Sequence, residues 1–322
     1  MNTYAKRIIT ALLFTAGLVC LLIITSRITM PKSNEPDCGM EEVVANAIMA
    51  ENPDTVDAVF LGDSETYCTF VPLQIWNDTG FTSYIIGTSE QTLDYSYTIL
   101  ERAFSRHSLK MVFLEANAIY RKESKEVPYA KLCELFPVFS YHDRWKSLNR
   151  NDFDLTATTE YSWTDYNKGY RYSDEIVPST NIDYVIPTDE KSRITPQNRY
   201  YVKKIKELCD SNGAELVLIS VPSTTNFTYK RHNGTTELAD ELGCEFIDMN
   251  LLPDEMQLGW TKDTRDKGNH LNYAGATKVT AWMSEYLKNK GLMKSRKDDP
   301  DCAGWYRDVM YFEKYKLNGE KL

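Results

Sequence analysis

Short apolar runs alternate with helix-like stretches along this 322-residue chain, and this alternation constrains the fold more than any other feature. The apolar runs, which read as strands, lie at 56–62, 83–87, 110–116, 214–222 and 244–249. Stretches with helical spacing or helix-end signals lie at 93–104, 196–213, 236–243 and 273–291. Strands that alternate with helices pair in parallel, and their helices cover both faces of the sheet. The sequence therefore predicts an α/β three-layer sandwich around a mostly parallel central sheet.

Composition narrows the class of protein. The chain is 42% apolar and 26% charged, which is typical of a folded globular protein and unlike a disordered or fibrous one. Its formal net charge of −9 leaves no basic excess to neutralise phosphates, so we expect no nucleic-acid partner.

The N-terminal segment indicates a membrane location. Residues 8–26 carry no charge over about 19 positions, which is long enough to cross the hydrocarbon core as a helix. Lys6 and Arg7 precede this run and favour a cytoplasmic N-terminus. A cleaved signal peptide is the alternative, but the run is long for one and no clean small-x-small cleavage site follows it. We predict a single-pass anchor in the cell membrane, with the rest of the chain extracytoplasmic.

The whole chain divides by composition into four parts. We expect a cytoplasmic tip and anchor at 1–30, a linker at 31–50, the α/β domain at 51–292 and a C-terminal tail at 293–322. A polar, aromatic insertion at about 118–195 interrupts the domain. Six cysteines lie outside the anchor and form no C-x-x-C pair, which argues against zinc and dithiol redox sites. A Cys38–Cys302 disulfide and reduced, buried cysteines remain alternatives.

Polar residues that carry chemistry follow several predicted strands. Ligands collect at the carboxyl ends of strands in open parallel sheets. Ser64 follows the first strand in LGDSETY, where the next helix presents its positive end to a developing oxyanion. Asp and Ser are also ordinary helix caps, so capping is an alternative reading of this turn.

A histidine precedes the last predicted helix of the domain. His270 lies in DTRDKGNHLNYAGA, and histidine is the usual base that takes the proton of a nucleophilic serine. A carboxylate must then hold the imidazole in the correct tautomer. Asp266, four residues before His270, and Asp263, seven residues before it, are both candidates.

These two motifs together resemble the SGNH (GDSL) hydrolase superfamily. The resemblance covers roughly residues 56–120 and 196–290. It implies that Ser64 is the nucleophile and His270 the base, with Asp266 as the orienting acid. It further implies an oxyanion hole made by the N–H groups of Ser64 and Gly87 and the side-chain amide of Asn117. No metal or cofactor is implied.

The chain departs from the family pattern at two places. The family usually places Asp three residues before the histidine, but Lys267 stands there. The family's G-x-N-D block reads E-A-N-A around Asn117, and capping of the strand end is the alternative role for this residue. The implied reaction is acyl transfer through a serine acyl-enzyme, with water or a sugar hydroxyl as the acceptor.

An anchor followed by an SGNH-like domain is similar to envelope proteins that move acyl groups onto surface polymers, such as the alginate O-acetylation proteins and DltD of teichoic acid D-alanylation. This layout implies an acylated cell-surface glycan as substrate and a membrane-bound O-acyltransferase as partner. Within the insertion, His142, Arg144 and Trp145 are candidates for a substrate groove. The alternative is that His142 and Trp145, three positions apart, form a packed pair on a helix. The competing hypothesis is an inactive SGNH-fold glycan-binding or scaffold protein of an acyl-transfer complex.

Overall fold

The computed structural model describes residues 3–318 and divides into two compact units. The first unit combines residues 1–43 with 125–163, and the second combines 44–124 with 164–322. Residues 1–2 of the predicted cytoplasmic tip and 319–322 of the predicted tail lie outside the described residues. Every cysteine in the described chain is free, so the Cys38–Cys302 disulfide is not formed.

The second unit is built on a five-stranded sheet, in which all of the strands are parallel. The spatial order is β2-β1-β3-β4-β5, so the chain moves to one side of β1 and then to the other. The strands are β1 (Ala58–Gly62), β2 (Ser83–Gly87), β3 (Met111–Glu115), β4 (Glu215–Ser220) and β5 (Glu245–Asp248). All residues of β1, β2 and β3 are buried, as expected for a sheet covered on both faces.

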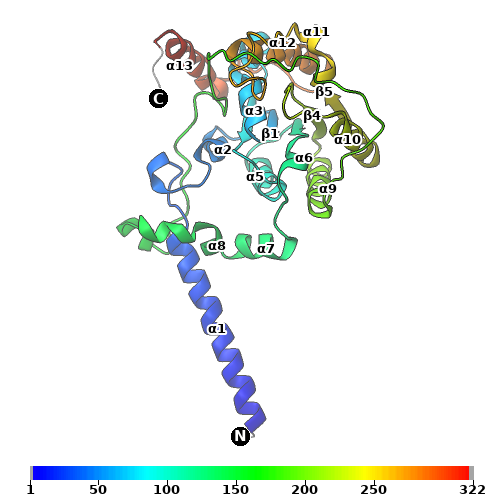
Figure 1. The fold of residues 1–322 in the computed structure, drawn as a ribbon. Helices are drawn as coiled ribbons and strands as arrows, with labels where there is room; N and C mark the ends of the chain where they lie inside the picture. The colour runs from blue at the N-terminus through cyan, green and yellow to red at the C-terminus, as the bar shows by residue number, and fades with distance from the viewer. Residues whose placement is uncertain (1–2, 319–322) are drawn as a thin grey trace. The chain divides into compact units, whose positions relative to one another are not determined.

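Helices cover both faces of this sheet (Figure 1). One group joins α12 to α3 and α4, and the other joins α5 to α9. The longer helices are α4 (Pro72–Thr79), α5 (Leu93–Arg106), α9 (Pro196–Ser211), α10 (Tyr229–Leu242) and α12 (Tyr273–Lys290). The shorter ones are α3 (Ser64–Thr69), α6 (Ala118–Arg121) and α11 (Pro253–Met256), with a 3-10 turn η5 (Met249–Leu251). The predicted three-layer α/β sandwich is therefore confirmed, including each predicted strand and helix.

Segments expected to be peripheral pack into the second unit. The predicted linker is helical at α2 (Val43–Asn46) and η2 (Ala47–Ala50), and Ile48 is fully buried. The predicted tail forms η6 (Pro300–Cys302) and α13 (Gly304–Asn318), and the ring of Trp305 lies 5.5 Å from that of Trp76. Both segments add apolar surface to the core, because Ile48 and Trp305 are almost entirely shielded from water.

A buried ion triplet ties distant segments of the second unit together. Lys168 is 2% exposed and lies 2.7 Å from carboxylates of both Glu51 and Asp308. A buried ammonium is tolerated only when it is paired, and these two carboxylates provide that compensation. The triplet therefore fixes residues near the start, middle and end of the chain.

The first unit contains α1 (Thr3–Thr29), the one helix of the described chain that is long and apolar enough to cross a membrane. Its other elements are η1 (Pro36–Cys38), α7 (Val127–Leu135), α8 (Val138–Tyr141), η3 (His142–Lys146) and η4 (Arg150–Phe153). The middle of the predicted insertion thus belongs to the unit that carries α1, whereas both of its ends belong to the unit that carries the sheet.

Candidate active site

Ser64 begins α3, one residue after the Asp63 cap that follows β1. The Asp63 side chain accepts a hydrogen bond of 3.0 Å from the backbone N–H of Glu65 and caps the helix. Gly62 allows Thr66 and Glu115 to pack closely against the end of β1, because a Cβ atom at this position would lie 2.3 Å from Thr66 Oγ1 and 2.6 Å from Glu115 Cβ. The G-D-S order therefore has a local physical basis: close packing, then a cap, then a hydroxyl at the helix start.

His270 lies in the loop that precedes α12, and it directly faces Ser64. Its Nε2 atom is 2.8 Å from Ser64 Oγ, although the two residues are 206 positions apart. The histidine side chain is 13% exposed, and Ser64 is 8% exposed. A hydroxyl this close to an imidazole nitrogen forms a hydrogen bond, and this arrangement defines an activated nucleophile.

Asp266 completes this chain of hydrogen bonds. Its Oδ2 atom lies 2.5 Å from His270 Nδ1, and its Oδ1 atom accepts a 2.6 Å hydrogen bond from the backbone N–H of His270. A carboxylate accepts a hydrogen bond from Nδ1–H, so Nε2 is left as the acceptor for the Ser64 hydroxyl. Partial burial opposes ionisation of Asp266, but the hydrogen bonds from His270 outweigh it and lower the pKa of this carboxyl.

The loop between Asp266 and His270 accommodates a spacing of four residues between the carboxylate and the imidazole. Lys267 and Gly268 both have left-handed backbone conformations, with φ of 64° and 93°. These two residues form a tight turn that brings Asp266 beneath the imidazole from four positions away. Asp263, the other sequence candidate, instead lies 2.6 Å from Lys278 Nζ and accepts a hydrogen bond from Gly259 N–H.

The predicted oxyanion donors lie at the carboxyl ends of the two strands that flank β1. Gly87 ends β2 and pairs in register with Gly62, and an added Cβ at Gly87 would lie 3.4 Å from the carbonyl oxygen of Asp63. Asn117 follows β3 directly before α6 and is 6% exposed. The structure thus brings both residues to the sheet edge that carries Ser64.

Asn117 is oriented by Arg231, a residue that sequence reasoning missed. The Arg231 guanidinium donates to Asn117 Oδ1 and also, at 3.0 Å, to the carbonyl oxygen of Asn226. Because a guanidinium only donates, the amide oxygen of Asn117 must face it. The amide nitrogen of Asn117 is buried and has no hydrogen-bond partner among residues 3–318. It is therefore a free donor.

The chain is similar to GDSL-like lipases and acylhydrolases. The lipase/acylhydrolase from Enterococcus faecalis is 12% identical, with a TM-score of 0.38, over 73% of this chain and 96% of that chain. A GDSL-like lipase from Bacteroides thetaiotaomicron is 14% identical, with a TM-score of 0.34, over 73% of this chain and 88% of that chain. No protein-family model matches the sequence, and no curated protein matches it either.

Three carboxyl groups lie buried close to Ser64. Asp63, Glu65 and Glu115 bring one oxygen atom each to within 4.8 Å of one another. Arg121 Nη1 lies 3.0 Å from Asp63 Oδ2 and supplies one positive charge. Burial and the neighbouring Asp63 charge raise the pKa of Glu65 to about 8, and burial raises that of Glu115 well above its usual range. We interpret the cluster as carboxyl groups neutralised by shared protons and by Arg121.

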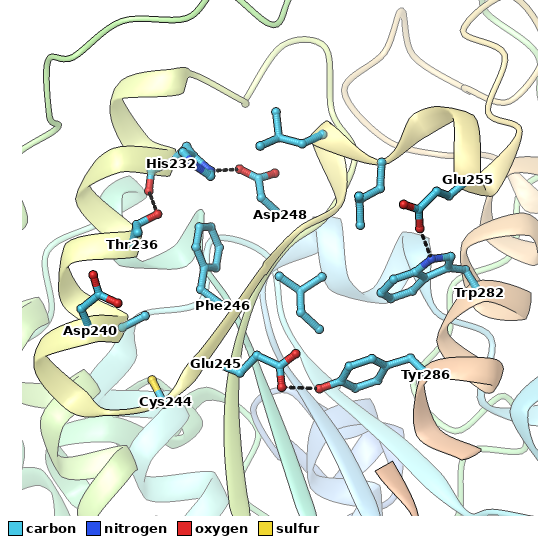
Figure 2. Close-up of a pocket in the computed structure, with 14 residues that line it drawn as sticks. His232, Thr236, Asp240, Cys244, Glu245, Phe246, Asp248, Glu255, Trp282 and Tyr286 are labelled. Atoms are coloured by element: carbon cyan, nitrogen blue, oxygen red, sulfur yellow. Dashed lines mark hydrogen bonds and ion pairs between the residues drawn. The ribbon is translucent and has the colours of Figure 1, made fainter. Parts of the chain in front are cut away.

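A separate cavity of about 650 Å³ lies at the free edge of β5, between α10 and α12 (Figure 2). His232 Nδ1 lies 2.8 Å from Asp248 Oδ2 in its wall. Trp282 donates to Glu255, and Tyr286 donates to Glu245, both at 2.9 Å. Each of these polar side chains has a hydrogen-bond partner within the cavity wall. The lining does not include Ser64 or His270, so this cavity is distinct from the site around these two residues.

His142, Arg144 and Trp145 belong to the first unit, whereas Ser64 belongs to the second. Arg144 is buried, and its guanidinium is bound to the Thr29 carbonyl and the Asp152 carboxylate. The side chains of His142 and Trp145 are 67% solvent-exposed. The substrate-groove role of these three residues stays a prediction, and the contacts of Arg144 give it a structural role in the first unit.

Proposed function

We propose that this chain is an SGNH-type serine esterase that forms an acyl-enzyme on Ser64. The observation that carries the proposal is the continuous hydrogen-bond path from Ser64 Oγ through His270 to Asp266. Such a path makes a serine hydroxyl nucleophilic at neutral pH, because the base removes its proton as the hydroxyl attacks. Capping alone does not explain it, since Asp63 already caps α3.

The proposed reaction has two balanced steps. Ser64 Oγ attacks the ester carbonyl while His270 Nε2 takes the hydroxyl proton, and the tetrahedral intermediate then expels the alcohol, which receives that proton from His270. Water, deprotonated by His270, attacks the resulting acyl-enzyme to give a second tetrahedral intermediate. Its collapse breaks the bond to Ser64 Oγ, which takes the proton back from His270 as the carboxylic acid is released. Throughout, Asp266 holds the imidazole and balances its transient positive charge.

The oxyanion of each tetrahedral intermediate needs hydrogen-bond donors. We assign the N–H groups of Ser64 and Gly87 and the side-chain amide of Asn117 to this role. The free donor on Asn117 supports the assignment, because a buried and unpaired N–H has no compensation until an acceptor arrives. One such donor contributes roughly 3 kcal/mol to transition-state stabilisation in other hydrolases.

We further propose that the enzyme is anchored in the membrane, lies outside the cytoplasm and acts on acyl esters of a cell-envelope glycan. Its proposed partner is a membrane-bound O-acyltransferase, and the acyl group passes to water or to a sugar hydroxyl. The length and hydropathy of α1 support the anchor. Residues just after α1 also support its retention: the Asn34 side chain accepts from Trp163 N–H and donates to the Trp163 carbonyl, so this region is part of a folded unit.

Labelling with a serine-reactive fluorophosphonate tests the proposal on the full chain in detergent micelles. We expect the wild-type chain to be labelled and to hydrolyse p-nitrophenyl acetate, and we expect Ser64→Ala to do neither. Ser83→Ala is the matched control, because Ser83 is also buried but lies at the opposite end of β2 from Gly87. Absence of labelling in folded wild-type chain, under conditions that label a control hydrolase, would overturn the enzymatic proposal in favour of a scaffold.

A further inference from the structure

The last turn of α1 is enclosed by short helices of the first unit. We call residues 135–155 the collar; it includes α8, η3 and η4, all three of which contact α1. Arg144 donates at 2.7 Å to the carbonyl oxygen of Thr29 and at 2.9 Å to Asp152, and Val138 N–H donates at 3.2 Å to Ser26 Oγ. The collar is thus bound to the C-terminal end of α1 (Figure 1).

Arg144 makes this attachment specific. The residue is 7% exposed, and its guanidinium satisfies a carbonyl group that the end of α1 leaves without an intrahelical partner. Gly39 has φ of 74° and allows close approach, since a Cβ there would lie 2.7 Å from Arg144 Nε. A buried charge with fixed partners holds α1 and the collar in one arrangement.

The collar exposes large apolar side chains to solvent. Leu135, Trp145, Phe153 and Leu155 are 70%, 67%, 60% and 43% exposed. Single exposed apolar residues are ordinary, but four within 21 consecutive positions form an unusual concentration (135–155). Such side chains gain free energy when another apolar phase removes them from water.

The geometry of α1 identifies that apolar phase. The uncharged stretch between Arg7 and Arg27 covers roughly 28 Å at about 1.5 Å per residue, which matches a hydrocarbon core of about 30 Å. Arg27 therefore marks the level at which the helix leaves the hydrocarbon. The collar contacts α1 at Ser26 and Thr29, so it lies at the same level. Tryptophan is enriched at this depth in membrane proteins.

We propose that the collar is seated in the lipid headgroup layer, with Leu135, Trp145 and Phe153 inserted toward the acyl chains. This inference rests on the proposed membrane anchoring by α1. The occupant is the phospholipid surface itself, because continuity with α1 places that surface beside the exposed side chains. The collar then acts as a stop that sets how far α1 enters the bilayer.

The test uses the full chain in phosphatidylcholine nanodiscs and measures quenching of tryptophan fluorescence by lipids brominated near the headgroup. We expect Trp145→Phe to remove most of the brominated-lipid quenching. The matched control is Trp305→Phe, which removes a 2% exposed tryptophan from the second unit and leaves the lipid-dependent quenching unchanged. Equal quenching of wild type and Trp145→Phe, with the chain embedded in the nanodisc, would overturn the inference.

Two further outcomes separate the alternatives. If the chain does not stay with the bilayer, the anchoring proposal fails and the collar inference fails with it, whereas the esterase assay is unaffected. If iodide reaches Trp145 in lipid-only nanodiscs but not in native membranes, the collar is covered by a protein instead of lipid, which also overturns the proposal.

Discussion

Arg231 donates to the side-chain oxygen of Asn117 and thereby leaves the amide nitrogen of Asn117 as a buried donor without a partner among the described residues. The two residues lie 114 positions apart, on either side of β4 in the sequence. Ala118, which follows Asn117, has no polar side chain that could orient the amide, and Arg231 makes this contact instead. Arg231 is a positioning residue, since it acts through Asn117.

Removal of Arg231 should slow the reaction only because the Asn117 amide loses its orientation. We expect Asn117→Ala to lower kcat about 100-fold, as loss of one oxyanion donor does elsewhere. Arg231→Met should lower kcat by roughly tenfold with little change in KM, because the misoriented amide still donates part of the time. Kinetics with p-nitrophenyl acetate measure both effects, and Arg231→Lys should restore part of the rate.

A double-mutant cycle distinguishes this role from a general effect on folding. The Asn117→Ala/Arg231→Met enzyme should be no slower than Asn117→Ala, because the arginine then has no amide to orient. Multiplicative losses in the double mutant would contradict the positioning role.

The two aspartates that precede His270 should differ in their effects. Asp266→Ala should lower kcat by about 10³- to 10⁴-fold, because the imidazole loses the acceptor that holds its tautomer. Asp263→Asn is the matched control: it weakens the contact with Lys278 and should lower the melting temperature while kcat stays within about threefold of wild type. A reversed pattern would assign the orienting carboxylate to Asp263.

Glu65 should make stability depend on pH. Burial, followed by the Asp63 charge, raises the pKa of Glu65 from an ordinary 4.5 to about 8. The folded chain then binds more protons than the unfolded chain between these values, so this group's contribution to stability is present below pH 4.5 and is lost as pH rises through 8. Glu65→Gln, which keeps the acceptor for Asn226, should match wild type near pH 5 and exceed its free energy of unfolding near pH 9. Denaturant unfolding at the two pH values measures this, and a parallel loss of stability in both proteins would refute it.

The close packing at Gly62 should exclude a methyl group. Gly62→Ala places a Cβ 2.3 Å from Thr66 Oγ1 and should cost about 1–3 kcal/mol of unfolding free energy through overpacking. Gly304→Ala is the matched control, because only the far end of Arg307 lies within 4 Å of a Cβ there. We expect its melting temperature to equal or exceed that of wild type, and equal losses in the two variants would contradict the packing argument.

Local patterns were sufficient to predict the five strands, their parallel pairing, and the helices α5, α9, α10 and α12. Each of these elements follows from spacing of apolar residues and from helix-end signals that lie within a few residues of one another. Ser64 and His270 were also found from sequence, since each lies in a short motif at the end of a predicted element. The spacing of apolar residues along the chain therefore predicts the architecture, and the short motifs at the element ends identify Ser64 and His270.

Contacts between distant segments decided the rest. Two aspartates were equally available to His270 by sequence, and the left-handed turn at Lys267 and Gly268 selects Asp266. No local pattern indicates that Arg231 orients Asn117, or that Arg144 closes the end of α1. The reason is that a hydrogen bond forms only when donor and acceptor lie within a few tenths of an ångström of the right distance. For side chains that are far apart in the sequence, only the packing of the sheet and its helices decides which pairs come that close.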